Sequence, residues 1–352
     1  MNKFKALAIT ITGVATLAAG SLLINNDASA ENLVRVAGSD RYETAANISR
    51  QTYSSKASSA VIVSGETFAD ALSATPLASA ANGPVLLIKK GVIPQTTWNE
   101  IQRILPAPQF NQYKLYVLGG EAVINKAQTD FLTAQGYDVV RLAGRDRMHT
   151  SVLAAMTADS LRGTKPGYAY IVNGFGFADG LAVGPLASIE KRNVLVTESG
   201  DLSQSVRDYV NGNIDTLAGV ALIGGTSVIP QSISDLFTSN GFGVTRIAGS
   251  NRYGTATKIA ESIITGAPTG GKGIGLASGR NFPDALAAGP LLAFTKNALI
   301  LDQPEGCKET LKYLQSAQNV IAGGFVFGGK NAVSSAAESV AEQVIGGAKP
   351  CK

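Results

Sequence analysis

Three aspartates with the same neighbours are the first residues in this sequence that could do chemistry. Asp70, Asp179 and Asp284 each follow a phenylalanine by two positions and precede a Pro-Leu pair by six. Carboxylates serve as general acids, bases or metal ligands only when suitable partners stand close by. Glycoside cleavage needs two of them together, and each copy of this motif keeps one. The motif therefore does not predict a hydrolytic centre.

Histidine chemistry is also disfavoured. His149 is the only histidine, and the matching positions of the other two copies hold Glu43 and Gly254. A Ser-His-Asp centre or a His-ligated zinc cannot be assembled around a residue that one copy alone carries. We therefore expect no catalytic residue, no metal and no cofactor.

A second motif, Arg-x-Ala-Gly-x-x-Arg, ends in an arginine that follows a helix-capping residue. These arginines are Arg41, Arg147 and Arg252. A cation in the first turn of a helix is opposed by the helix dipole, so its presence in all three copies indicates a fixed anionic partner. That partner is either the aspartate of the same copy, in a salt bridge, or a bound anion, and the two interpretations are compatible.

Glycine turns stand where a strand passes into a helix. They are Ser64-Gly65, Asn173-Gly174 and Ser278-Gly279. Backbone N–H groups at such a sheet edge can bind an anion, so these six residues are candidate ligand-binding positions. The alternative is that glycine only permits a tight turn. None of the turns has a dinucleotide or Walker fingerprint, which disfavours nucleotide binding.

The elements that position these residues repeat with a period of about 105 residues, which indicates triplication. Short apolar runs without polar alternation, separated by helical stretches, predict parallel strands covered on both faces. We expect an α/β fold of three tandem modules with mostly parallel sheets, at 31–138, 139–243 and 244–352. In the first copy we expect strands at 34–37, 60–63, 85–88 and 115–118, and helices at 41–53, 68–81, 95–105 and 126–134. No linker separates the copies, so they should share sheet boundaries.

The first thirty residues predict an export signal rather than part of the fold. Lys3 and Lys5 precede an apolar run, and Ala28-Ser29-Ala30 resembles a cleavage site. No later run is long enough for a membrane helix, so we expect a secreted protein without a membrane span. The formal charge of +4 suits an anionic surface polymer but not nucleic acid, whose binding proteins carry dense basic stripes.

Cys307 and Cys351 are the only cysteines. Outside the cell such a pair most often forms a disulfide. Closing a loop of this length would stabilise the fold by about 4 kcal/mol. Two free thiols are the alternative.

Taken together, the Arg-x-Ala-Gly-x-x-Arg start, the Phe-x-Asp block and the strands that end in Gly-Gly resemble the type 2 cell-wall-binding repeat of Gram-positive surface proteins. The resemblance covers all three copies. It implies Rossmann-like, Toprim-like modules in a pseudo-threefold arrangement, anchored non-covalently to an anionic secondary wall polymer of teichoic-acid type. In that family a Pro-Ile-Leu-Leu strand contributes to binding. Its proline survives here once, as Pro84.

The resulting prediction is a non-catalytic wall-binding protein at the cell surface. Arg41, Arg147 and Arg252 would neutralise polymer charge, while the glycine turns would offer N–H donors. Two alternatives are kept: an accessory or modulator of an amidase-type wall hydrolase, and a structural protein that builds a surface layer. Other surface proteins are a further class of partner.

Overall fold

A computed structural model describes residues 33–106, 113–265, 271–302 and 309–348. The predicted export signal and both cysteines lie outside these residues. In the part of the chain that is described, none of the helices combines the length and the apolar character needed to cross a bilayer.

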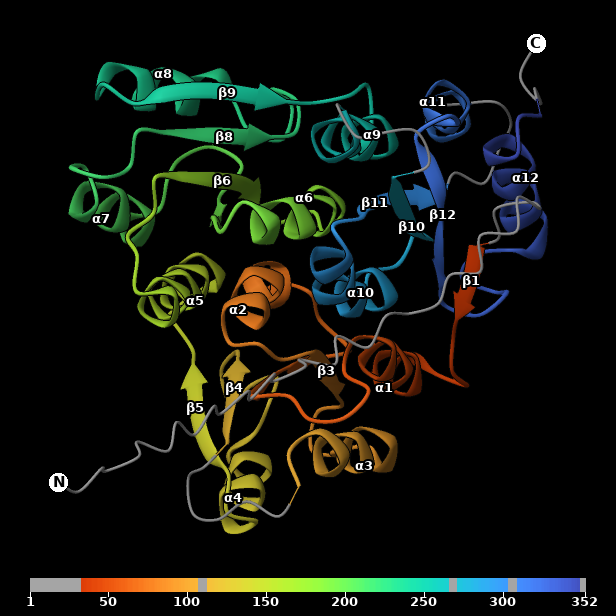
Figure 1. Ribbon diagram of the computed structural model, residues 1–352. Helices are drawn as coiled ribbons and strands as arrows, with labels where there is room; N and C mark the ends of the chain where they lie inside the picture. Colours follow the sequence, from red (N-terminus) through yellow and green to blue (C-terminus); the bar gives the residue numbers. More distant parts are fainter. Residues whose placement is uncertain (1–32, 107–112, 266–270, 303–308, 349–352) are drawn as a thin grey trace, which may run out of the picture. The chain divides into compact units, whose positions relative to one another are not determined.

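Strands and helices alternate along the chain (Figure 1). The strands are β1 (Leu33–Val36), β2 (Ser59–Ser64), β3 (Val85–Ile88), β4 (Lys114–Leu118), β5 (Asp138–Leu142), β6 (Tyr168–Asn173), β7 (Asn193–Thr197), β8 (Gly219–Ile223), β9 (Gly243–Ile247), β10 (Lys272–Ser278), β11 (Ala298–Asp302) and β12 (Ile321–Phe327). The helices are α1 (Arg41–Thr52), α2 (Ala74–Ala80), α3 (Gln95–Ile104), α4 (Lys126–Ala134), α5 (Arg147–Arg162), α6 (Ala178–Ile189), α7 (Gln204–Gly212), α8 (Gln231–Ser239), α9 (Arg252–Ile264), α10 (Pro283–Thr295), α11 (Glu309–Ala317) and α12 (Ser335–Ile345).

The expected α/β class is confirmed, because the strands form three parallel four-stranded sheets. Module 1 has the strand order β3-β2-β4-β5, module 2 has β7-β6-β8-β9, and module 3 has β11-β10-β12-β1. The central strands β2 and β8 are buried along their whole length, and β6 is buried except at its first residue, as the apolar runs predict. In Figure 1 the red β1 lies beside the blue β12, so the first strand of the chain completes the last sheet.

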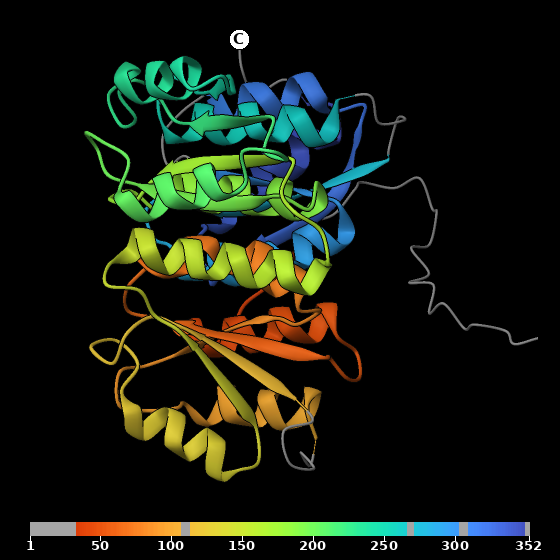
Figure 2. The ribbon, with the colours of Figure 1, turned by 90° about the vertical axis from the view of Figure 1, so that its left-hand side faces the viewer.

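The opening strand of each copy therefore belongs to the preceding sheet. β5 pairs with β4, and β9 pairs with β8. The helix that follows each opening strand packs on the next sheet and also contacts the preceding module. For example, α5 packs on β7 and contacts α2 of module 1. Figure 2 shows α5 between the strands of module 1 and the rest of module 2. The limits at 138/139 and 243/244 remain predictions, since each falls at the start of one of these strands.

The helix expected at 68–81 is shorter than predicted. A 3₁₀ turn covers Ala71–Ser73, and α2 begins only at Ala74. Pro76 falls in the first turn of α2, but the equivalent Pro185 and Pro290 lie inside α6 and α10, so proline does not account for the late start. The other helices expected in the first copy end within one residue of α1, α3 and α4.

Helices α2, α6 and α10 contact one another where the modules meet. Thr75, Gly184 and Gly289 occupy the same position in the three copies, five residues after the motif aspartate. A Cβ placed on Gly184 would lie 3.1 Å from Thr75 Oγ1, and one on Gly289 would overlap that hydroxyl. Equivalent positions in mutual contact define a pseudo-threefold axis, and the axis has room for one side chain among the three.

Candidate functional site

The second arginine of each motif is the first residue of a helix. Arg41, Arg147 and Arg252 begin α1, α5 and α9, behind the N-cap residues Asp40, Asp146 and Asn251. Each cap side chain accepts backbone N–H groups of the first turn. This satisfies donors that have no partner inside the helix. The capping residue thus fixes where each helix begins, and with it the position of the arginine.

Each of these guanidinium groups is tied to a glycine turn of its own module. The Nη1 atom of Arg41 donates to the carbonyl of Gly65, that of Arg147 to Gly174 at 2.6 Å, and that of Arg252 to Gly279 at 2.9 Å. No carboxylate in the described chain forms an ion pair with any of the three. A guanidinium has five N–H donors, and the only protein acceptor that the described residues provide for each group is its glycine carbonyl. Arg252 is exposed and the other two are half-buried.

Each motif aspartate lies over the first glycine of the Gly-Gly turn in its own module. A Cβ placed on Gly119 would be 3.0 Å from Asp70 Oδ2, and one on Gly224 would be 2.7 Å from Asp179 Oδ2. These turns end β4 and β8, next to the ends of β2 and β6. At that point the chain reverses its direction of winding across the sheet. Such switch points at the carboxyl ends of strands are where open α/β sheets bind ligands.

Burial raises the pKa of Asp179 and of Asp284 to about 6, and it raises the pKa of Asp70 as well. Desolvation is the main cause, because it disfavours the charged form of a carboxyl group. An arginine opposes the shift in each case: Arg147 for Asp70, Arg252 for Asp179 and Arg41 for Asp284.

A salt bridge between the arginine and the aspartate of the same copy, one of the two interpretations of the sequence, is absent from the ion pairs of the described residues. The arginine that lowers the pKa of each aspartate belongs to the next module. For Asp284, in the last module, that arginine is Arg41 of module 1. The reason is that the opening strand of each copy pairs in the sheet of the preceding module. Because β5 lies in the sheet of module 1, α5 starts at the carboxyl edge of that sheet and brings Arg147 towards Asp70. We call each such arginine–aspartate pair a junction.

Three aromatic rings meet between the junctions. They belong to Phe68, Phe177 and Phe282, and their ring centroids lie 5.7, 5.9 and 6.3 Å apart. Edge-on contacts of this kind stabilise beyond area burial. The guanidinium of Arg252 lies 5.3 Å from the ring centroid of Phe177 in the preceding module, a cation–π distance. The rings thus hold the modules together at the place where the junctions form.

The glycine turns make local hydrogen bonds that hold their own shape. Ser64 Oγ accepts the N–H groups of Glu66 and Thr67. Asn173 and Ser278 accept the N–H two positions ahead in the same way. The N–H of Gly65 donates to Ile88, and that of Gly174 donates to Thr197. The N–H groups of Gly65 and Gly174 thus already have acceptors, and the carbonyls of all three glycines accept from the arginines.

The sequence matches the family described as cell wall binding domain 2 over residues 35–129, 141–234 and 246–338. The chain belongs to that family. The matched segments begin at the first arginine of each motif and include the junction arginines and aspartates.

Solved structures with the same fold include Cwp6 and Cwp8 from Clostridium difficile. Each superposes with a TM-score of 0.77 over 90% of this chain. The sequence identity is 23% for Cwp6 and 25% for Cwp8, and the match covers 48% of the Cwp6 chain and 52% of the Cwp8 chain. Among curated proteins, the N-acetylmuramoyl-L-alanine amidase LytC of Bacillus subtilis is 30% identical over 302 residues, which is 86% of this chain and 56% of the relative. The amidase enhancer of the same organism is 29% identical over 76% of this chain and 34% of its own. The chain spans about half the length or less of these relatives.

One predicted site residue of this cell wall binding domain 2 chain lies away from the rest. Pro84 is buried directly before β3, and Val61 donates to its carbonyl at the amino end of β2. The junctions gather at the opposite, carboxyl edge of the sheet. Four strand residues, or about 13 Å, separate the two edges, so Pro84 is not brought to the arginines.

The first arginine of each cell wall binding domain 2 motif has a role that sequence reasoning missed. The Nη1 atom of Arg35 donates to Gly328 at 2.6 Å, that of Arg141 to Gly119 at 2.8 Å, and that of Arg246 to Gly224 at 2.8 Å. These arginines clamp the Gly-Gly turns beneath the aspartates. Their recurrence at a constant distance from the second arginine was the available signal.

The described residues contain no group of three or more His, Cys, Asp or Glu side chains that could hold a metal ion. At the junctions the arginines offer positive charge and hydrogen-bond donors. A guanidinium with unspent donors can pair with an anion.

Proposed function

We propose that this protein anchors non-covalently to an anionic polymer of the cell wall through its three junction arginines, and that it does so without catalysis. The observation that carries the proposal is the unspent donors of Arg41, Arg147 and Arg252, repeated at three switch points of a chain that belongs to a cell-wall-binding family. Arginine suits the charged oxygens of such a polymer because its planar fork can pair with them in a bidentate manner.

Weak contacts suffice in this arrangement. The junctions are held on one rigid body by the aromatic rings and by α2, α6 and α10. Once one junction holds a polymer chain, the others meet it at a raised effective concentration. The export signal predicted at 1–30 and the family membership support a secreted location at the wall.

Binding to purified wall sacculi tests this proposal. We expect each of Arg41→Gln, Arg147→Gln and Arg252→Gln to weaken binding by roughly tenfold, since a hydrogen-bonded charge contact is worth about 1.5–3 kcal/mol. The triple variant should bind no better than background. Lys126→Gln is the matched control, because Lys126 is exposed on α4 and carries the same unit charge.

Sacculi stripped chemically of anionic polymer provide the second arm. The wild type should lose its binding to them and behave like the triple variant. Undiminished binding of the wild type to stripped sacculi would remove polymer recognition from the account. If the triple variant bound sacculi with wild-type affinity, the three arginines would not be the polymer-binding residues.

A role beside a wall hydrolase is a second candidate, favoured by the two curated relatives named as an amidase and an amidase enhancer. In this role the chain would bind the wall and place or modulate a separate enzyme. Zymography of the purified chain separates the classes. A clearing band from the chain alone would show catalysis and contradict the non-catalytic proposal, whereas faster clearing by an added amidase would support the accessory role.

A further inference from the structure

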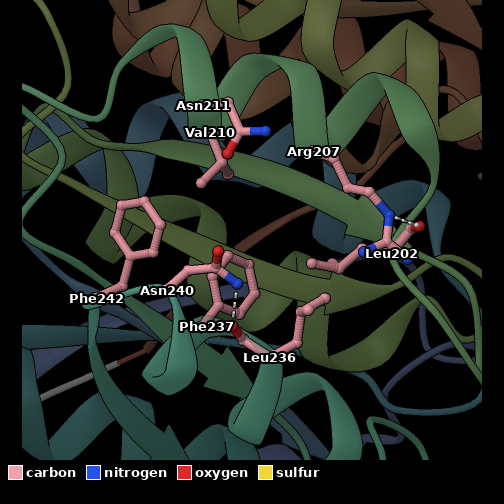
Figure 3. Close-up of a pocket in the computed structure, with 8 residues that line it drawn as sticks. All are labelled: Leu202, Arg207, Val210, Asn211, Leu236, Phe237, Asn240 and Phe242. Carbon is pink, nitrogen blue, oxygen red and sulfur yellow. Dashed lines mark hydrogen bonds between the residues drawn. The ribbon is translucent and has the colours of Figure 1, made fainter.

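A cavity of about 200 Å³ opens between α7 and α8 in module 2 (Figure 3). Its apolar lining is mostly buried, and exposed amides stand at its rim. The lining residues are Leu202, Arg207, Val210, Asn211, Leu236, Phe237, Asn240 and Phe242. No junction residue is among them. The main contacts of α7 and α8 are with elements of module 2, so the cavity is separate from the proposed polymer site.

Module 1 shows which shape fits this space. The fourth residue of α3 is Trp98, and the fourth residue of α7 is Arg207. The ring of Trp98 packs edge-on against Phe131 and Tyr137, with centroids 5.2 and 6.2 Å away. Tyr137 directly precedes β5, and Phe242 of the cavity lining directly precedes β9. The cavity is thus the space that an indole fills in module 1.

The side chain of Arg207 leaves that space open, because its guanidinium is hydrogen-bonded to groups at positions 201 and 202. Its Nη2 donates to Asp201 Oδ1 at 2.5 Å, and its Nε donates to the carbonyl of Leu202 at 3.0 Å. Within the described chain, the side-chain amide of Asn211 and the Oδ1 of Asn240 have no protein partner. The rim therefore offers a donor and acceptors beside an apolar floor.

The chain segment that lines the cavity is acidic. Residues 198–243 contain one basic side chain, Arg207, while the whole chain has a formal charge of +4. The five acidic side chains of this segment are all exposed: Glu198, Asp201, Asp208, Asp215 and Asp235. Such a field repels an anionic polymer and attracts a cationic partner.

We propose that the cavity between α7 and α8 binds an aromatic side chain carried by a basic polypeptide segment of a partner protein. The indole-shaped space selects the ring, and the carboxylates around it select the flanking charge. Since the cavity lies apart from the junctions, a partner could be held while the arginines engage the wall.

The direct probe is the tripeptide Lys-Trp-Lys, acetylated and amidated, followed by backbone amide shifts. We expect shifts in α7 and α8 and none in α3 and α4, where Trp98 occupies the space. Raising the salt from roughly 0.05 to 0.3 M should weaken binding several-fold, because the charge contacts lie at an exposed surface. Lys-Ala-Lys and Glu-Trp-Glu should not bind. Equal binding of either one, or no binding of Lys-Trp-Lys, overturns the proposal.

Two substitutions at one position separate the cavity from the charge. Arg207→Gln and Arg207→Trp both remove the same positive charge and make the surface more acidic. Arg207→Gln should bind Lys-Trp-Lys as tightly as the wild type or more tightly. Arg207→Trp should lose at least about tenfold in affinity, since a buried ring contributes most of such a contact. Module 1 tolerates tryptophan at this position, and unchanged thermal unfolding would show that the variant folds.

If the two variants bind alike, the cavity is not the site. A second copy of this chain is the other conceivable occupant, because Phe294 is 74% exposed and stands near Lys296. Concentration-dependent sedimentation that Phe294→Ser abolishes would assign the cavity to self-association and overturn the proposal. Wall binding by Arg207→Trp should equal that of the wild type, so failure here is distinguishable from failure of the polymer proposal.

Discussion

Asp179 occupies an unfavourable environment for a charged carboxyl group. Its Oδ1 is buried without a hydrogen-bond partner in the described chain, and burial raises its pKa to about 6 against an ordinary value of 3.8. Arg252 opposes the shift without cancelling it. Because the folded pKa is the higher of the two, folding favours the protonated form. The stabilisation is fully present below the unfolded pKa and is lost as the pH rises through about 6.

Asp179→Asn should remove this pH dependence. Relative to the variant, the wild type should lose roughly 1–3 kcal/mol of unfolding free energy between about pH 4 and pH 7, at 1.36 kcal/mol per pKa unit and with allowance for partial exposure. Urea denaturation of both proteins across this range measures the difference. Asp235→Asn, at an exposed position, controls for the loss of one charge. Parallel curves for wild type and Asp179→Asn would contradict the assignment.

At the scale of elements, the two glycines of each Gly-Gly turn have different tasks. Gly224 has a φ of +116°, and a Cβ there would lie 2.6 Å from Val228 Cγ2 and 2.7 Å from Asp179 Oδ2. Side chains rarely adopt that backbone conformation. A Cβ on Gly225 would meet nothing closer than 3.9 Å. The first glycine seats the aspartate of the junction, while the second faces open space.

Gly224→Ala should therefore destabilise the protein by roughly 1–3 kcal/mol through backbone strain, with added displacement of Asp179. Gly225→Ala is the matched control and should change the unfolding free energy by less than about 1 kcal/mol. Chemical denaturation compares the two. Equal losses would mean that the turn does not distinguish its two positions.

At the scale of the whole molecule, the modules are linked in a cycle. Each sheet takes its edge strand from the next copy, and β1 closes the last sheet through Arg35, which pairs with Glu338 at 2.7 Å. Around the axis, Thr75 projects against Gly184 and Gly289. Because the junctions combine groups from two modules, their geometry depends on this assembly.

Gly289→Ala should weaken the assembly by roughly 1–3 kcal/mol, because the new methyl group overlaps the Thr75 hydroxyl in a packed core. Thr75→Gly in the same chain should recover part of the loss by making room. Gly212→Ala, in a helix with no atom within 4 Å of the added Cβ, should be neutral or stabilising. Differential scanning calorimetry reads all three. A double variant less stable than Gly289→Ala would contradict the proposed contact.

Local patterns explain why part of this architecture could be predicted from sequence. Asp40 caps α1 where expected, and α4 spans Lys126–Ala134 as predicted, because capping and hydrophobic periodicity act within a few residues. The buried runs gave parallel strands, and the repeat gave three modules. The recurrence of Arg41 and Asp70 in every copy also marked them as candidate site residues.

The sequence by itself determined the repeated elements, their class and the residues that the copies keep. Only the tertiary structure decided which module supplies the arginine for the aspartate of another module. Parallel strands pair with partners that are distant in sequence. The residues around β5 therefore do not indicate that it pairs with β4, and those around β1 do not indicate that it pairs with β12. The pairing of β5 with β4 brings the start of α5 to the carboxyl edge of the module 1 sheet, where Arg147 opposes the rise in the pKa of Asp70. The cavity in module 2 was likewise decided by packing, since an arginine in place of tryptophan leaves a space only if its charge is drawn elsewhere, here to Asp201.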